Sequence, residues 1–298
     1  MADVLLQAPG NDALRFRERW EGGPIPRRIA VLNEKGGSGK TTLVASMASH
    51  LALCGGRRVL AIDMDPQGQL GKVLGVDVRQ ARRTAIELLV DAVVGESAAP
   101  RDARERGDLP ILPTRIPQLD VVVAHKALGL APAIGPEEPD PTGRLRRRLD
   151  AAPVLADYDY VLIDGPPSFG LLTLNVLRAV DEVVVPVPLT FLALDGCAEL
   201  VRTIDGLRTR YGHAGLRISM VVPTFHRRTR LAEEVLATLE RRFPKEIAHT
   251  VVGWHVKIDE AQSRGLSVFE YAPRDRGALA LAALAQELEA RSPVGALA

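Results

Sequence analysis

The run KGGSGKTT at residues 35–42 decides the fold. A short apolar run at residues 29–32 precedes it, and a run with helical spacing of apolar residues, 40–53, follows it. A glycine-rich turn between a strand and a helix lets the backbone fold closely around a polyphosphate, while the helix offers free N–H groups and the positive end of its dipole. The sequence therefore predicts a phosphate-binding loop, or P-loop, made of Lys35, Gly36, Gly37, Ser38, Gly39, Lys40, Thr41 and Thr42.

Short runs of β-branched residues alternate with longer runs of helical spacing over most of the chain. The predicted strands are residues 28–32, 58–63, 119–123, 160–164, 182–187, 218–222 and 248–252. The predicted helices are residues 40–53, 171–180, 194–211, 230–243 and 278–290. Runs such as 161–163 and 183–185 are apolar at every position, as expected where helices cover both faces of a sheet. We therefore expect an α/β fold, with a doubly wound, mostly parallel sheet flanked by helices.

The composition is that of an ordinary globular chain, with 298 residues of which 46% are hydrophobic and 25% charged. Because 38 Lys and Arg face 37 Asp and Glu, the net charge of +1 gives no sign of nucleic-acid binding, and any basic surface must be local. Apolar runs such as 183–189 are too short to span a membrane, and residues 1–10 lack the pattern of a secretion signal, so we expect a soluble cytoplasmic protein. Cys54 and Cys197, the two cysteines, cannot build a disulfide framework or a structural zinc site, although a single disulfide stays open.

Three residues carry the predicted chemistry of the phosphate site. Lys40 is placed to neutralise β- and γ-phosphate oxygens, and Thr41 offers a hydroxyl to magnesium. Asp164 ends a buried apolar strand, where an unpaired carboxylate would be costly, so a magnesium ion is its natural partner. ATP and Mg²⁺ are therefore the expected cofactors, with Thr41 and Asp164 at the metal.

The loop departs from the common P-loop pattern in having Glu34 instead of glycine and an additional lysine, Lys35. In these residues the chain resembles the deviant Walker A motif, K-G-G-x-G-K-T-T, of the ParA/MinD family of ATPases. In that family the early lysine reaches across a nucleotide-sandwich dimer to the phosphates of the partner's ATP. The resemblance thus implies an ATP-dependent homodimer with Lys35 as a catalytic residue, acting in trans as an arginine finger does.

A second motif follows the next predicted strand, where Asp63-Met64-Asp65-Pro66-Gln67 resembles the family's D-x-D-P-Q. The resemblance implies that Asp63 orients the attacking water and that Asp65, Pro66 and Gln67 shape a switch loop beside the nucleotide. An acidic residue at a strand end is also often just a helix cap, and that interpretation stays open.

A third motif, Tyr160–Asp164 followed by Gly165-Pro166-Pro167, resembles the family's Walker B segment. Gly165 stands where the family usually has Cys or Thr. The resemblance runs from about residue 28 to 290, so we expect a flexible N-terminal extension at 1–27, a single ParA-type ATPase domain at 28–292 and a tail at 293–298. The extension is too short for a helix-turn-helix domain, so operator-specific repression is not expected. A Pro- and Gly-rich stretch at 131–143 is expected to be a loop.

The segment at residues 250–261 resembles a family segment that reads V-I-P-R-N-V-K-L-x-E-A, with Gly253, Trp254 and His255 in place of Pro, Arg and Asn. That loop contacts adenine and ribose in the family, so Trp254 and His255 are the candidate base-binding residues. Trp254 could stack on a purine, but half-buried packing is the commoner role of such a tryptophan.

Arginines cluster in the second half of the chain and predict contacts with DNA phosphates. The candidate DNA-binding residues are Arg202, Arg208, Arg227, Arg228, Arg230, Arg241 and Arg242. Since no aromatic residues alternate with them, we expect binding to double-stranded DNA without sequence preference. For any single arginine, an ordinary solvated helix face is the alternative, and the basic run at 144–148 fits the exposed side of a helix.

The resemblance implies a DNA partition ATPase whose ATP-bound dimer binds the nucleoid and is released when a ParB-like partner stimulates hydrolysis. Two alternatives stay open: a positioning ATPase that moves a protein cargo on the nucleoid, and a metabolic ATP-dependent enzyme of the same fold. A membrane role is not expected, because residues 279–298 do not form a basic amphipathic helix. An iron–sulfur reductase would need two cysteines on switch loops, and Cys54 and Cys197 do not lie in the predicted switch segments.

Overall fold

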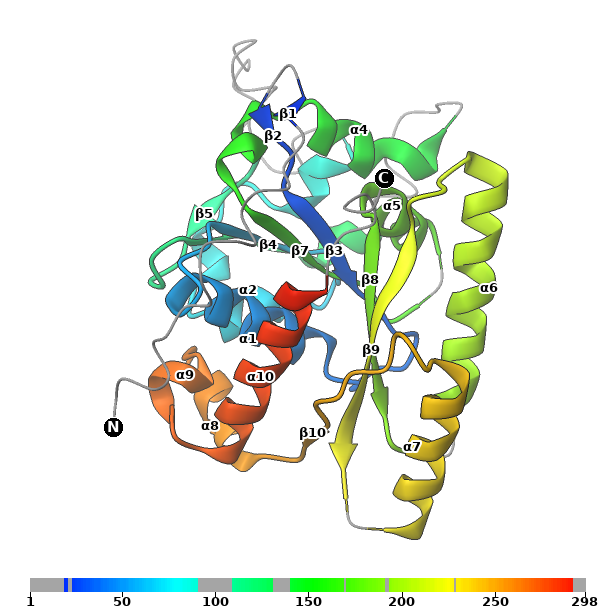
Figure 1. Ribbon diagram of the computed structural model, residues 1–298. Helices are drawn as coiled ribbons and strands as arrows, with labels where there is room; N and C mark the ends of the chain where they lie inside the picture. The colour runs from blue at the N-terminus through cyan, green and yellow to red at the C-terminus, as the bar shows by residue number, and fades with distance from the viewer. Residues whose placement is uncertain are drawn as a thin grey trace, which may run out of the picture.

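The computed structural model describes residues 19–20, 23–90, 109–130, 140–168, 170–190, 193–227 and 229–291. These residues form one eight-stranded sheet in the order β10-β9-β8-β3-β7-β4-β6-β5 (Figure 1). Neighbouring strands run parallel except for β5 and β6, which pair antiparallel at one edge. The strands of this sheet are β3 (Arg27–Val31), β4 (Val59–Asp63), β5 (Leu112–Pro113), β6 (Leu119–Val122), β7 (Tyr160–Asp164), β8 (Glu182–Pro188), β9 (Arg217–His226) and β10 (Val252–Gly253). A separate two-stranded ribbon pairs β1 (Arg19–Trp20) with β2 (Gly23–Pro24).

Helices cover both faces of the sheet (Figure 1). They are α1 (Lys40–Leu53), α2 (Leu70–Val73), α4 (Arg144–Asp150), α5 (Leu171–Ala179), α6 (Ala193–Tyr211), α7 (Arg230–Arg242), α8 (Val256–Ser263), α9 (Val268–Tyr271) and α10 (Arg276–Ala290). One hydrophobic core holds buried residues of α1, α8 and α10, and a second holds those of α4, α5, α6 and α7. The predicted doubly wound α/β fold is confirmed. Within the described ranges, no helix is both long and apolar enough to cross a membrane.

The interior strands explain why the sheet forms where the sequence predicts it. β4, β7 and β8 are buried at every residue. Burying a valine, leucine or isoleucine side chain contributes about 1.5–3 kcal/mol, so these strands anchor the fold. β3 lies between β8 and β7, so the strand order changes direction at β3. The loop that leaves β3 therefore opens at the switch point of the sheet, where α/β proteins bind ligands.

The last predicted strand, 248–252, is only partly right. The ladder with β9 begins at Val252, and Ile247 forms an isolated bridge with Val221. The backbone N–H groups of His249 and Thr250 donate instead to the Glu287 carboxylate at 3.0 and 3.3 Å. The Glu287 side chain of α10 thus accepts the N–H groups that a longer strand would have paired.

Several elements escape the sequence prediction, namely β5, α2, α8 and α9. The basic run at 144–148 lies on α4, as a helix face was expected to. The sheet begins at Arg27, one residue before the predicted strand at 28–32, and the predicted extension contains the β1–β2 ribbon. Its remaining residues, the 293–298 tail and most of the predicted 131–143 loop lie outside the described residues. The domain boundaries therefore stay predictions.

Candidate functional site

The predicted P-loop connects β3 to α1 as a tight turn. Gly37 and Gly39 have φ angles of 70° and 93°, a left-handed backbone that glycine adopts without steric cost. Lys40 is buried with 6% exposure, and burial lowers the pKa of its ammonium group while the charges of Asp164 and Asp65 raise it. Ser38 Oγ is buried and has no hydrogen-bond partner in the part of the chain that the structure describes. An anion in this loop would meet a buried cation and free backbone donors.

Two carboxylates meet beside the loop because β4 and β7 are neighbours. Asp63 and Asp164 are cross-strand partners at the ends of these strands. Burial raises the pKa of Asp164 to about 7, even though the hydrogen bond from Thr41 and the charge of Lys40 lower it. Burial, together with the charge of Asp164, raises the pKa of Asp63 as well. Such a pair is costly without a cation.

The two predicted magnesium residues are in contact, since Thr41 Oγ1 donates a 2.6 Å hydrogen bond to Asp164 Oδ2. Asp164 Oδ1 is buried and, among the described residues, has no hydrogen-bond partner. A hydroxyl and a carboxylate with a free oxygen are the ligands that Mg²⁺ takes beside nucleotide phosphates. The residues present therefore fit this metal. Nowhere in the described residues do three or more His, Cys, Asp or Glu side chains gather into another metal site.

Asp63 holds the predicted switch loop in place. Its carboxylate accepts the Asp65 N–H at 3.1 Å and the Leu70 N–H at 3.0 Å, and its exposure is 0%. Asp65 in turn accepts the Gln67 N–H at 2.9 Å. Leu70 is the first residue of α2, so the helix-cap interpretation describes one of these contacts. The water-orienting role stays a prediction.

Lys35 makes its hydrogen bonds to residues of the same chain. Its Nζ donates to Thr190 Oγ1 at 3.2 Å, and its backbone N–H donates to Asn33 Oδ1 at 2.8 Å. Asn33 Nδ2 donates to the Pro186 carbonyl at 2.6 Å, which ties the loop to β8. Lys35 therefore lies at the mouth of the site, half-buried and attached to the segment after β8.

The glycine that departs from the Walker B pattern has a steric cause. A Cβ atom at Gly165 would overlap Leu32 Cδ2 and lie 3.1 Å from Leu32 Cγ. Leu32 is 2% exposed and directly follows β3. The leucine thus fills the space that a larger residue at position 165 would need.

The candidate base-binding loop lies next to the P-loop. Trp254 is 53% exposed, and its ring centroid lies 5.3 Å from that of Phe225 at an angle of 47°. Phe225 Cζ lies 3.5 Å from the position of a Cβ on Gly39. His255 is half-buried and packs beside Gly253 and the first turn of α10. The structure therefore brings Trp254 to the P-loop through Phe225.

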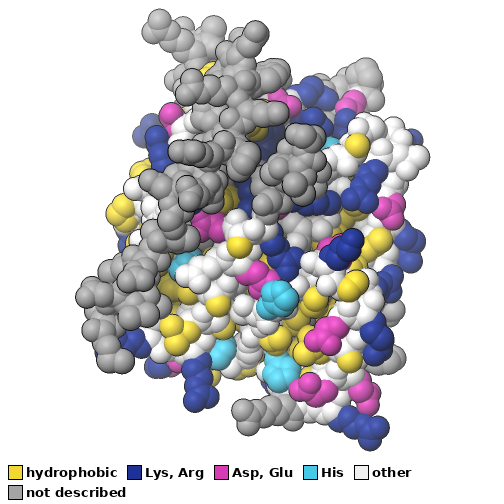
Figure 2. All heavy atoms as spheres, in the orientation of Figure 1, with side chains coloured by type: hydrophobic (Ala, Val, Ile, Leu, Met, Phe, Trp, Pro, Cys, Tyr) yellow, Lys and Arg dark blue, Asp and Glu magenta, His cyan; other side chains and the backbone are white. Residues whose placement is uncertain are grey.

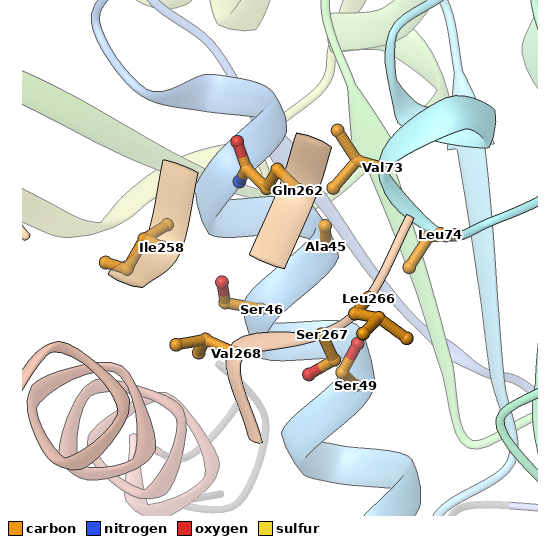
Figure 3. A pocket seen from close by; sticks show the side chains of 10 residues that line it. All are labelled: Ala45, Ser46, Ser49, Val73, Leu74, Ile258, Gln262, Leu266, Ser267 and Val268. Atoms are coloured by element: carbon orange, nitrogen blue, oxygen red, sulfur yellow. The ribbon is translucent and has the colours of Figure 1, made fainter. Parts of the chain in front are cut away.

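Two contributors to the site have no signal in the sequence. Phe225, next to last in β9, belongs to none of the motifs. Gln262 of α8 donates from Nε2 to Thr42 Oγ1 at 3.0 Å across 220 positions. Gln262 also lines a small hollow between α1 and the α8–α9 segment, together with Ser46 and Ser49 (Figure 3). This hollow contains none of the P-loop residues that precede α1, so it is not the nucleotide site.

The candidate DNA-binding arginines spread over α6, α7 and the segment between β9 and α7. Figure 2 shows Lys and Arg side chains along the margin formed by α6 and α7 rather than in one compact cluster. Arg208 is engaged in the fold, because its Nε donates to the Leu216 carbonyl at 2.6 Å. Arg202, Arg241 and Arg242 are exposed, and Arg228 lies outside the described residues.

Two of the candidate arginines lie at or just before the start of α7. Arg230 is 93% exposed and pairs with Glu234 at 3.0 Å. The guanidinium carbon of Arg227 lies 5.8 Å from the centroid of the Trp254 ring. Arg227 is therefore in contact with the candidate base-binding loop, and the role of Arg227 and Arg230 in DNA binding stays a prediction.

The two cysteines are not joined. Cys197 is buried on α6 and Cys54 is half-buried at the end of α1, and both are free thiols. Burial raises the pKa of both, that of Cys197 to about 11. Neither belongs to the P-loop or to the carboxylate pair, so neither takes part in this site.

Comparison with known proteins points to one family. A sequence profile described as an AAA domain matches residues 26–218. The chain is 36% identical over 268 residues to the sporulation initiation inhibitor protein Soj of Bacillus subtilis, covering 88% of this chain and 98% of the relative. It is 37% identical over 267 residues to the chromosome partitioning protein ParA of Caulobacter vibrioides, covering 89% and 94%.

A solved structure shares the fold at lower identity. Cobyrinic acid a,c-diamide synthase from Mycobacterium smegmatis, with bound ADP and magnesium, has a TM-score of 0.71 and 29% sequence identity, covering 89% of this chain and 94% of the synthase. McdA from Cyanothece superposes with a TM-score of 0.71 at 19% identity, covering 88% of this chain and 98% of McdA, and shows likeness of fold alone.

Fold and site together define a P-loop nucleotide-binding protein with two lysines in the loop. The match to the profile and the identity to Soj and ParA place it more narrowly. The chain belongs to the ParA family of ATPases, as the three motifs predict.

Proposed function

We propose that this protein is a DNA partition ATPase. Two copies enclose two ATP molecules, the dimer binds double-stranded DNA without sequence preference, and hydrolysis stimulated by a partner protein releases it. The observation that carries the proposal is the Thr41–Asp164 contact beneath a loop with a second lysine, in a chain similar to chromosome-partitioning proteins. The proposed partner is a ParB-like protein, and the proposed location is the nucleoid in the cytoplasm.

Each chain would bind its ATP with its own P-loop residues. The backbone of Gly36–Gly39 cradles the phosphates, Lys40 neutralises their charge, and Thr41 with Asp164 would hold magnesium. When bound, the ion neutralises charge on the phosphate oxygens. The synthase structure, which contains ADP and magnesium, agrees with ATP and Mg²⁺ as cofactors.

In this proposal, hydrolysis requires the switch loop to move. Asp63 is proposed to orient the attacking water, but both its oxygens now accept backbone N–H groups of Asp65 and Leu70. Opening the loop that carries Asp65, Pro66 and Gln67 would free this carboxylate. We infer that partner stimulation favours the open loop, so that turnover is slow without the partner.

Dimerisation would use Lys35. In the single chain its ammonium group contacts the Thr190 hydroxyl, a neutral partner that a phosphate oxygen can replace. ATP offers a γ-phosphate to the partner's Lys35 and ADP does not, so the dimer is populated only before hydrolysis. Trp254 and His255 are proposed to contact the adenine and ribose of the bound nucleotide.

The DNA surface would be the α6–α7 margin, doubled across the dimer. The test is the affinity for a random DNA duplex at two salt concentrations with no nucleotide, with ADP, and with a slowly hydrolysed ATP analogue. We expect binding only with the analogue and a steep loss of affinity with salt. Replacing Arg227, Arg228 and Arg230 by Glu should abolish binding while nucleotide binding persists. A duplex affinity that ignores nucleotide would contradict the proposal.

A metabolic enzyme is the second candidate, because the synthase from Mycobacterium smegmatis has 29% identity and the same fold. Turnover that requires a small-molecule acid and ignores DNA would favour it. A positioning role for a protein cargo would give the same DNA result, and the identity of the stimulating partner separates it from DNA partition.

A further inference from the structure

Phe225 has an unusual backbone conformation. Its φ angle is +54°, and the only other described non-glycine residue with positive φ is Gln118. A bulky aromatic residue rarely adopts this left-handed region, because its Cβ crowds the following carbonyl. Such a conformation persists only where the surroundings impose it, and it is commonest at functional sites.

The P-loop imposes the conformation from one side. Thr224 Oγ1 donates a 3.2 Å hydrogen bond to the Ser38 carbonyl, and both side chains are buried. The next residue, Phe225, lies against Gly39, with its Cζ 3.5 Å from a Cβ position there. Two successive residues of β9 thus hold two successive residues of the P-loop. Gly39 immediately precedes α1, so any shift of the loop around a phosphate moves the surface on which Phe225 rests.

The arginine segment is attached to the other side of Phe225. The Phe225 ring packs on Trp254 at 5.3 Å, and Arg227 lies over the Trp254 ring at 5.8 Å. Thr229 follows as the N-cap of α7, accepting the Ala232 N–H at 3.2 Å. Phe225 therefore contacts both the P-loop, at Gly39, and Trp254, the ring over which Arg227 lies.

We infer that Phe225 is the positioning residue that couples the P-loop to Arg227, the candidate DNA-binding arginine that lies over the Trp254 ring. The inference rests on the proposed function for its DNA part only. Phosphate binding at Gly39 shifts the Phe225 ring, the ring shifts Trp254, and Arg227 changes position relative to the DNA margin.

The experiment compares Phe225→Gly with a matched control, Gln118→Gly. Both variants relieve a positive φ, but Gln118 lies at the turn before β6, away from the P-loop. Amide hydrogen exchange of residues 226–233 is measured on the full chain with and without a slowly hydrolysed ATP analogue at saturation. We expect a nucleotide-dependent change of protection in the wild type and in Gln118→Gly, and its loss in Phe225→Gly.

DNA affinity gives the second readout. Coupling between two sites commonly changes affinity about 5- to 150-fold, so we expect the analogue to raise duplex affinity by a factor in that range for the wild type. For Phe225→Gly the ratio should fall to about one. If Phe225→Gly does not fold, Phe225→Leu keeps an apolar side chain but removes the ring that packs on Trp254, and it should likewise remove the nucleotide-dependent protection.

Two results overturn the inference. One is a wild type in which the analogue leaves the exchange of residues 226–233 unchanged, and the other is a Phe225→Gly variant that keeps the wild-type change. Absence of DNA binding by the wild type in every nucleotide state contradicts the proposed function instead, and the exchange data still decide the coupling.

Discussion

The Thr41 hydroxyl donates a 2.6 Å hydrogen bond to Asp164 Oδ2, joining the first turn of α1 to the end of β7 across 123 positions of sequence. The contact assembles the proposed magnesium site from two separate motifs. It leaves Asp164 Oδ1 buried and, within the described residues, without a partner. The unpaired carboxylate oxygen therefore lowers the free energy of unfolding of the nucleotide-free protein, and a bound cation would offset this loss.

Asp164→Asn should make the nucleotide-free protein more stable while removing its activity. The substitution replaces a buried carboxylate by a neutral amide of the same shape, which we expect to raise the free energy of unfolding by about 1–3 kcal/mol. Magnesium-dependent ATP hydrolysis should fall at least ~100-fold. Urea unfolding in the presence of a chelator and steady-state turnover test the two effects. Asp157→Asn, at an exposed position, is the control, and a less stable but active Asp164→Asn protein would refute the assignment.

Substitutions of the two loop lysines should affect nucleotide binding and dimerisation differently. Lys40 is buried in the P-loop, so Lys40→Ala should weaken ATP and ADP binding at least ~100-fold and abolish the dimer with it. Lys35→Ala removes an exposed contact with Thr190 and should leave nucleotide binding nearly intact while preventing the ATP-dependent dimer. Calorimetric titration measures the first property and light scattering the second. A Lys35→Ala protein that still dimerises with ATP would show that Lys35 does not act in trans.

The motifs of the site could be predicted because each is contiguous and lies at the end of a strand or the start of a helix. Contacts between distant positions could not. The Gln262–Thr42 hydrogen bond spans 220 positions and has no periodic signal. The left-handed backbone of Phe225 goes against the preference of its residue type, so composition points away from it. The motif predicts that Asp63 orients water, but it gives no sign that the Asp65 and Leu70 N–H groups each donate to one of its two oxygens.

Gly165 and Leu32 should be energetically coupled. Gly165→Ala forces a methyl group into Leu32 Cδ2, and we expect a loss of about 1–3 kcal/mol in the free energy of unfolding. In the Leu32→Ala background the clash with the leucine is gone and only the 3.2 Å approach to the Val31 carbonyl remains. The double variant should therefore lose less than the sum of the single variants by about 1 kcal/mol or more. Gly206→Ala on α6 is the control, since a Cβ there meets nothing within 4 Å. A double variant whose losses simply add would show that the two positions are independent.

His50 should make stability depend on pH. It lies in the last turn of α1, is 4% exposed, and packs against Phe269 with ring centroids 5.3 Å apart. Burial lowers the pKa of the imidazole, and the charge of Glu289 on α10 offsets part of this shift. The unfolded chain then binds a proton that the folded chain does not bind, so stability is complete above the unfolded value of about 6.5 and falls as the pH decreases below it.

His50→Gln should remove this contribution between about pH 6.5 and pH 5. Asp164, whose pKa is raised to about 7, contributes a slope of opposite sign in the same window. Because Asp164 is present in both proteins, the difference between their slopes isolates His50. The slope attributable to one proton is at most about 1.4 kcal/mol per pH unit, so urea unfolding at four or five pH values resolves it. The same change at exposed His249 is the control and should keep the wild-type slope. Because a buried, uncharged imidazole is the sole cause invoked, a His50→Gln protein with the wild-type slope would show that His50 accepts its proton without cost in the folded state.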